Sequence, residues 1–128
     1  METKTNRKKE KFMNPNQELR KILKELQIKT PKRITKEFLN TLDWGRISRY
    51  RNLSEGFIEN YDNLVDWYCI SIYQKLSEPF IETYANQVHW ISIAIYQKLS
   101  KPFSEKYADR IKTIEKFADR IGWKWLSR

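Results

Sequence analysis

Residue types suited to catalysis are few and isolated in this chain of 128 residues. Cys69 is the single cysteine and His89 the single histidine, so neither a Cys–His catalytic pair nor a histidine-centred metal cluster is expected. Glu59, Glu82 and Glu105 recur at one spacing, but repeated helix pairs would hold them ~10 Å apart, which is too regular for an acid/base pair. There is no glycine-rich phosphate loop either. The sequence therefore predicts a non-enzymatic protein without catalytic, cofactor-binding or metal-binding residues.

The regular spacing of these glutamates comes from an internal repeat of 23 residues. Full copies start at Trp44, Trp67 and Trp90, and the second copy is identical to each of the others at 13 of 23 positions. Partial copies flank them at 34–44 and 114–128. Periods of this length are typical of repeat architectures, so we expect a helical repeat array over residues 31–128.

The residues common to all copies recur every three or four positions, which is the period of a helix. The stretch ISIAIY at 91–96 alternates between apolar and small residues, so a strand in the front half of each copy stays open as an alternative. Serines precede the back halves and aspartates precede two front halves, where they can cap helices: Ser54, Ser77, Ser100, Asp43 and Asp66. Because helices of two or three turns are marginal alone, we expect all-α, helix-turn-helix repeats stacked as a small α-solenoid.

The N-terminal part of the chain differs from the repeats. Asn14 and Pro15 form a typical helix start, followed by apolar residues at helical spacing, so residues 14–30 are predicted to be an N-terminal capping helix. Thr30 and Pro31 predict the start of the next helix in the same way. Residues 1–13 have few apolar groups and are predicted to be a disordered basic tail.

The repeat pattern W-x2-I-S-x2-[QR]-x-L-S-[EK]-x-F-x-E-x2-Y resembles a short repeat of uncharacterised proteins in large DNA viruses and bacteriophages. It is carried by ISRYRNLSEGFIENY, ISIYQKLSEPFIETY and IAIYQKLSKPFSEKY, each of which follows a tryptophan closely. The likeness covers about residues 34–128, and the chain departs from it at Ala94 and Thr113, where the pattern has Ser and Trp. The resemblance implies a viral or phage accessory protein with a lineage-specific number of repeats and assigns no activity.

Two sets of residues are candidates for binding a partner. One tryptophan per repeat at a core position is read as core, whereas the tyrosine six positions later and its two neighbours are predicted to line an exposed ridge. This partner-binding set is Tyr50, Arg51, Tyr73, Gln74, Lys75, Tyr96, Gln97 and Lys98. The alternative set, for nucleic acid, takes basic residues from both ends of the chain: Arg7, Lys8, Lys9, Lys11, Lys112, Lys116, Arg120, Lys124 and Arg128.

The charge distribution favours a protein partner over nucleic acid. The net charge is +9, yet residues 34–100 carry six Lys/Arg against eight Asp/Glu, and the basic excess lies at the two ends. We therefore expect a protein-protein interaction or adaptor module that acts on a host or viral protein, with nucleic-acid binding as the alternative. An open C-terminal edge containing Trp123 and Trp125 also predicts a homodimer contact.

The cellular setting follows from what the sequence lacks. No apolar run approaches the roughly 20 residues that span a bilayer, and the charged start METKTNRKKEKF has no apolar leader. A single cysteine fits a reducing compartment. The sequence thus predicts an intracellular protein, in the host cytoplasm or nucleus if it is viral, that is neither secreted nor bound to a membrane.

Overall fold

The computed structural model describes residues 13–111, and this part of the chain is helical without any strand. The predicted all-α class is therefore confirmed, and helices form the front halves of the repeats, where a strand was the alternative. The chain divides into two compact units, unit 1 comprising Met1–Val65 and unit 2 comprising Asp66–Arg128. Among the described residues, no helix is long and apolar enough to cross a membrane. Stacking into a solenoid stays a prediction.

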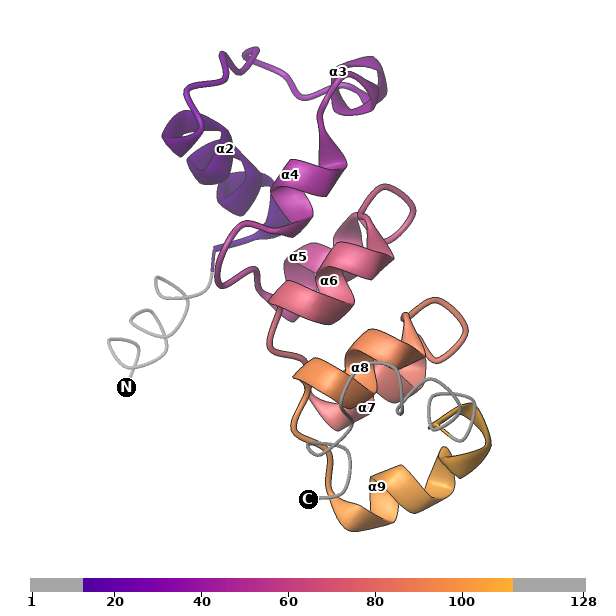
Figure 1. The fold of residues 1–128 in the computed structure, drawn as a ribbon. Coiled ribbons are helices and arrows are strands. Elements are labelled where there is room, and N and C mark those ends of the chain that lie inside the picture. Colours follow the sequence, from indigo (N-terminus) through magenta and orange to yellow (C-terminus); the bar gives the residue numbers. More distant parts are fainter. Residues whose placement is uncertain (1–12, 112–128) are drawn as a thin grey trace, which may run out of the picture. The chain divides into compact units, whose positions relative to one another are not determined.

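The described part of unit 1 contains four helices: α2 (Pro15–Glu25), α3 (Lys36–Asn40), α4 (Trp44–Ser48) and α5 (Glu55–Asn60) (Figure 1). The predicted start of α2 is confirmed, because Asn14 and Gln17 form a capping box that satisfies two backbone amides. The buried face of α2, made of Leu19, Ile22 and Leu23, follows the helical period, and α2 packs against α5.

The end of α2 is a Schellman motif. The amide of Ile28 donates to the carbonyl of Leu23 at 2.8 Å, and that of Gln27 donates to Lys24 at 3.0 Å. Gln27 takes the left-handed conformation this motif needs, with φ of 62°, at a position where glycine is the usual residue. The chain thus leaves the helix by a sharp turn.

The helix predicted to start at Thr30 and Pro31 is absent, and this prediction is wrong. Thr35 is the N-cap instead, with its side chain accepting from the amide of Phe38 at 3.1 Å. The guanidinium of Arg20 donates to the carbonyls of Pro31 and Lys32 at 3.1 and 2.8 Å. Because these carbonyls accept hydrogen bonds from Arg20, the segment between α2 and α3 is a non-helical connection that is anchored to α2.

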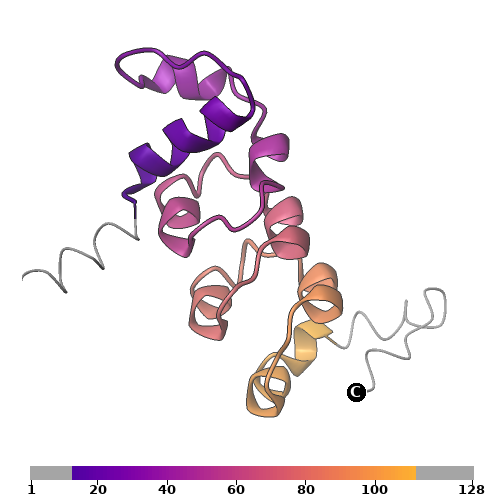
Figure 2. The same ribbon diagram turned by 90° about the vertical axis from the view of Figure 1, so that its left-hand side faces the viewer.

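Between residues 66 and 111, unit 2 contains one helix pair in two copies: α6 (Trp67–Tyr73) and α7 (Glu78–Thr83), then α8 (Trp90–Tyr96) and α9 (Lys101–Lys106). Figure 2 shows these helices, from pink to yellow, as short coils joined by loops. The predicted serine N-caps of α5, α7 and α9 are confirmed, because each serine accepts a hydrogen bond from the amide three residues later. Both predicted aspartate caps, on α4 and α6, are confirmed in the same way.

Each full copy builds its own aromatic cluster, from the tryptophan, the phenylalanine and the second tyrosine of the repeat. In the first copy the ring centroids of Trp44 and Tyr61 lie 5.3 Å apart, and those of Phe57 and Tyr61 lie 4.9 Å apart. The equivalent distances are 4.7 and 4.9 Å in the second copy and 4.9 and 4.8 Å in the third. Such aromatic pairs contribute about 0.5–1.5 kcal/mol each beyond the burial of their area. The conserved spacing of the repeat therefore encodes a local core.

The tryptophans of the first and third copies also tie their front helices to the segment before them. The indole N–H of Trp44 donates to the carbonyl of Leu39, and that of Trp90 donates to Ala85, both at 2.8 Å. Trp44 is buried, whereas Trp67 and Trp90 are half-buried. The prediction that the tryptophans belong to the core is confirmed most fully for Trp44.

Candidate partner-binding surface

The predicted ridge residues of unit 2 lie where the front helices end. Gln74 and Gln97 follow α6 and α8 directly and have extended backbones, with φ/ψ of −102°/141° and −97°/151°. Successive side chains alternate sides along an extended chain. Accordingly, Tyr73 and Lys75 are exposed while Gln74 between them is buried, with 2% of its surface accessible.

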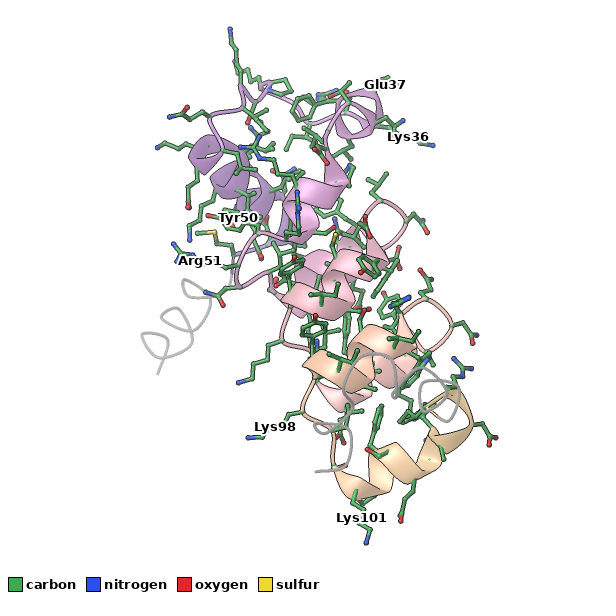
Figure 3. All side chains as sticks on the ribbon, viewed as in Figure 1. Lys36, Glu37, Tyr50, Arg51, Lys98 and Lys101 are labelled. Carbon is green, nitrogen blue, oxygen red and sulfur yellow. The ribbon has the colours of Figure 1, made fainter. Side chains whose placement is uncertain are left out.

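The third copy follows the same pattern. Tyr96 and Lys98 are exposed, and Figure 3 shows Lys98 extending away from the ribbon. The exposed fractions of Tyr73 and Tyr96 are 56% and 58%, among the highest of any large apolar or aromatic side chain in the described residues. We call Tyr73, Lys75, Tyr96 and Lys98 the Tyr/Lys face.

Gln97 holds the two halves of this face together. Its side-chain nitrogen donates to the carbonyls of Ser71 and Gln74 at 2.9 and 2.7 Å, and its side-chain oxygen accepts from the amide of Leu76 at 3.1 Å. These three bonds join the third copy to the second, and α6 packs against α8. The expectation that Gln74 lines the exposed ridge is therefore wrong, and Gln97 is half-buried. The side-chain amide of Gln97 satisfies backbone groups of the neighbouring copy, and Gln74 is buried.

The first copy has the same tyrosine but a different loop. Tyr50 is half-buried, and its hydroxyl donates to the carboxylate of Glu25 in α2. Arg51 is exposed at the position that Gln74 and Gln97 occupy in the later copies, and Asn52 turns the chain with φ of 63°. Asparagine tolerates this left-handed conformation better than most residues. Tyr50 and Arg51 therefore do not repeat the geometry of the Tyr/Lys face.

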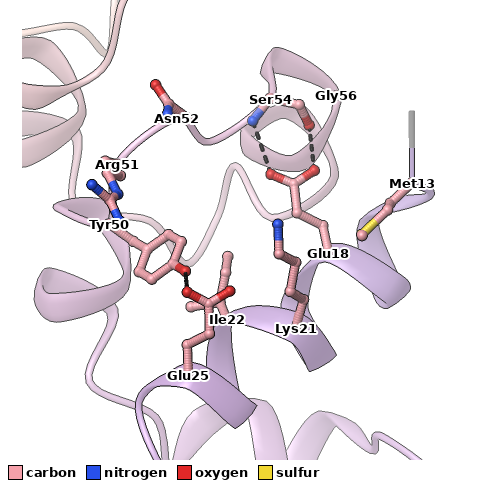
Figure 4. Close-up of a pocket in the computed structure, with 10 residues that line it drawn as sticks. All are labelled: Met13, Glu18, Lys21, Ile22, Glu25, Tyr50, Arg51, Asn52, Ser54 and Gly56. Carbon is pink, nitrogen blue, oxygen red and sulfur yellow. Dashed lines mark hydrogen bonds between the residues drawn. The ribbon is translucent and has the colours of Figure 1, made fainter. Parts of the chain in front are cut away.

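Tyr50 instead closes one side of a groove in unit 1 with a volume of about 450 Å³ (Figure 4). The groove runs between α2 and the segment that joins α4 to α5. Its lining from the α2 side is Met13, Glu18, Lys21, Ile22 and Glu25, and its lining from the other side is Tyr50, Arg51, Asn52, Ser54 and Gly56. Neither the histidine nor the cysteine lines it, and its charges of both signs point to no single ligand.

Two tyrosines of unit 1 have perturbed acidity. The hydrogen bond to Glu25, followed by desolvation, raises the pKa of Tyr50 above its ordinary value. Burial raises the pKa of Tyr61, which lies in the first aromatic cluster. Both hydroxyls thus stay protonated at neutral pH, and neither is poised as a base.

A glutamate–serine clasp was missed by the sequence analysis. Both carboxylate oxygens of Glu78 accept from Ser100, from its amide at 2.5 Å and its hydroxyl at 2.9 Å. Glu18 of α2 accepts from the amide and hydroxyl of Ser54 in the same way, at 2.9 and 2.6 Å. A signal for the clasp was present in the sequence, because the glutamate and its serine partner are lost together. Lys101 replaces the glutamate in the third copy, and the serine expected 23 positions after Ser100 is absent.

The two chemically distinctive residues make structural contacts. His89 is the N-cap residue of α8 but forms no side-chain cap; its Nδ1 lies 2.8 Å from the hydroxyl of Ser92, and its ring meets Tyr68 edge-on with centroids 4.9 Å apart. Cys69 is half-buried and not in a disulfide. Within residues 13–111, no group of three or more His, Cys, Asp or Glu side chains is arranged to hold a metal ion.

Trp123 and Trp125 of the predicted dimer edge lie outside the described residues. The same is true of all the residues proposed to bind nucleic acid: Arg7, Lys8, Lys9, Lys11, Lys112, Lys116, Arg120, Lys124 and Arg128. The predicted tail, apart from Met13, and the last partial copy fall in the same two end segments. Their roles stay predictions.

No protein-family model, curated protein or solved structure matches this chain. The resemblance to the viral and phage repeat thus stays a prediction, and a function has to be inferred from the surface itself.

Proposed function

We propose that this protein is a non-enzymatic protein-binding module whose contact surface is the Tyr/Lys face of unit 2. The observation that carries the proposal is the exposure of two tyrosines, Tyr73 and Tyr96, at equivalent positions of packed repeats. Exposing an aromatic ring to water costs free energy that burial against a partner recovers, and tyrosine is enriched where proteins bind each other. The second and third copies thus each present the tyrosine six positions after the tryptophan to solvent.

The rigidity of this face supports binding. Because Gln97 bonds to the backbone of residues 71–76, the backbone that carries the Tyr/Lys face is held before a partner arrives. A surface that is already ordered loses less conformational entropy on association. The resemblance to viral and phage repeats implies that the partner is a host or viral protein.

Nucleic-acid binding is the second candidate, and it rests on the basic residues at the two ends of the chain. Residues 1–33 carry 11 Lys/Arg against four Asp/Glu, and residues 101–128 carry eight against four. Such ends would neutralise phosphates and bind in a salt-dependent manner.

The test is capture of partners by wild-type protein and by the Tyr73→Ala/Tyr96→Ala variant, with Tyr68→Ala as the matched control. Tyr68 is 55% exposed in the same unit but lies outside the Tyr/Lys face. We expect proteins retained by wild type and Tyr68→Ala to be lost from the double variant, while circular dichroism shows all three folded. Equal retention by all three proteins would refute the proposal.

A parallel titration with single- and double-stranded DNA and RNA at increasing salt separates the second candidate. Sub-micromolar affinity at physiological salt that weakens steeply as salt rises, and that is lost when residues 1–13 are deleted, would put nucleic acid first. Absence of such binding would leave the basic ends without a nucleic-acid role.

A further inference from the structure

We propose that the Tyr/Lys face binds an acidic protein segment in the polyproline II conformation, with carboxylates three residues apart. This inference rests on the proposed function, since it names the chemistry of the partner that the same surface would take. It is carried by the spacing, the charge and the aromatic content of the face.

The spacing of the two lysines follows from the Gln97 bridge. Gln97 bonds to backbone groups of Gln74 and Leu76, the two residues that flank Lys75, so Lys98 stands in the segment directly beside Lys75. Packed helices lie about 8–10 Å apart, and α6 packs against α8, so we expect equivalent residues of the two copies to be separated by about that distance. A polyproline II helix has three residues per turn and rises about 3.1 Å per residue, so residues i and i+3 face one side about 9 Å apart. A β-strand would instead repeat every two residues, at about 7 Å.

The charge of the face favours carboxylates. Lys75 and Lys98 are exposed, and within the described residues neither forms an ion pair. Glu78, the acidic residue nearest to Lys75 in the sequence, directs both carboxylate oxygens to Ser100. Lys101 replaces the corresponding glutamate of the third copy and adds a further exposed cation. The two lysines are therefore available to a partner of opposite charge.

The tyrosines favour the polyproline II conformation over other extended shapes. Proline-rich segments dock onto surfaces lined by aromatic rings, and their conformation is already formed before binding. Tyr73 and Tyr96 offer two such rings, one beside each lysine. A nucleic acid is the less favoured occupant, because residues 34–100 as a whole carry more acidic than basic residues.

The experiment measures fluorescence anisotropy of short labelled peptides of identical composition, built from Pro, Ala and Glu, against the full chain at low salt. The glutamates are placed two, three or four residues apart. We expect the three-residue spacing to bind at least about threefold tighter than the others, and its affinity to fall as salt screens the charges. Single exposed ion pairs are weak, so Lys75→Ala and Lys98→Ala should each weaken it about two- to fivefold.

The Lys75→Ala/Lys98→Ala variant should lose the spacing preference. Lys106→Ala, which removes the same charge from α9 where Lys106 pairs with Glu82 at 3.0 Å, should keep it. Failure of all acidic peptides to bind, equal affinity at every spacing, or a preference that survives the double variant would each overturn the inference. So would tighter binding of oligothymidine that depends on both lysines.

This outcome is separable from that of the proposed function. If tyrosine-dependent capture of proteins succeeds while the acidic peptides fail, the protein-binding role stands and the partner chemistry is wrong. The spacing comparison on the wild-type chain needs no variant, so it holds even if a variant is poorly folded.

Discussion

The same tyrosine has opposite roles in the two units. Tyr50 of unit 1 bonds to Glu25 of α2 and closes a groove, whereas Tyr96 of unit 2 is 58% exposed. The difference lies in the residue that follows: Gln97 bridges to the previous copy and keeps the chain extended, while exposed Arg51 makes no such bridge and the chain turns at Asn52. The loops of the first and third copies thus differ both in their backbone course and in how far they expose the tyrosine.

The aromatic clusters, by contrast, are common to both units, and removing their tryptophans should have the largest effect. We expect Trp44→Ala and Trp67→Ala each to reduce the free energy of unfolding by about 3 kcal/mol, at the lower end for a large core aromatic because Trp67 is half-buried. Urea unfolding followed by circular dichroism measures this, with Tyr68→Ala expected within about 0.5 kcal/mol of wild type. A loss below about 1 kcal/mol at either tryptophan would break the equivalence of the two cores.

Gln97→Ala should be the next most harmful change. It removes three hydrogen bonds and strands backbone groups of Ser71, Gln74 and Leu76, so we expect a loss of about 2 kcal/mol. Arg51→Ala at the equivalent position of unit 1 should cost less than about 0.5 kcal/mol. The same urea titrations compare the two. Equal effects would mean that the glutamine bridge does not distinguish the units.

The glutamate–serine clasp should act alike in both units and with smaller effect. Glu18→Gln and Glu78→Gln each leave one acceptor oxygen where the carboxylate had two, so each should cost about 1 kcal/mol. Glu37→Gln on exposed α3 serves as the control and should change stability little. Thermal unfolding measures the melting temperature of all three variants. A lower melting temperature for only one of Glu18→Gln and Glu78→Gln would show that the clasp stabilises one unit and not the other.

Tyr50→Phe should have the smallest effect, about 0.5 kcal/mol from one exposed hydrogen bond. Because the pKa of Tyr50 is raised in the folded protein, the folded state keeps this proton at pH values where the unfolded state releases it. The contribution of Tyr50 is therefore complete below pH ~10 and declines as pH rises above that value. Unfolding of wild type and Tyr50→Phe from pH 8 to 11 should show the difference between them shrinking, and a growing difference would contradict the assignment.

The secondary structure of the repeats was largely predictable, because it is encoded locally. The serine and aspartate caps act within three residues, and the aromatic spacing acts within one copy, so both are visible in the sequence. The failed helix start at Thr30 and Pro31 had the right residue types. It failed because the guanidinium of Arg20, 11 and 12 residues away, takes up the carbonyls of that segment.

The binding surface was predictable only in part. Tyr73, Lys75, Tyr96 and Lys98 are exposed as expected of the ridge, but the two glutamines between them are not part of it. Alternation along an extended segment hides every second residue, and the extended backbone after α6 and α8 was not evident from a helical pattern.

Sequence alone determined the all-α class, the repeat, its caps and its aromatic clusters, since each depends on residues within a few turns of one another. Tertiary structure decided which side of each loop faces water, which glutamate reaches which serine, and that Tyr50 is tied to α2. These outcomes depend on partners 22 to 36 residues away, whose identity no local periodicity carries. Local patterns thus built the repeats, and long-range hydrogen bonds helped to give the equivalent loops of the first and third copies different surfaces.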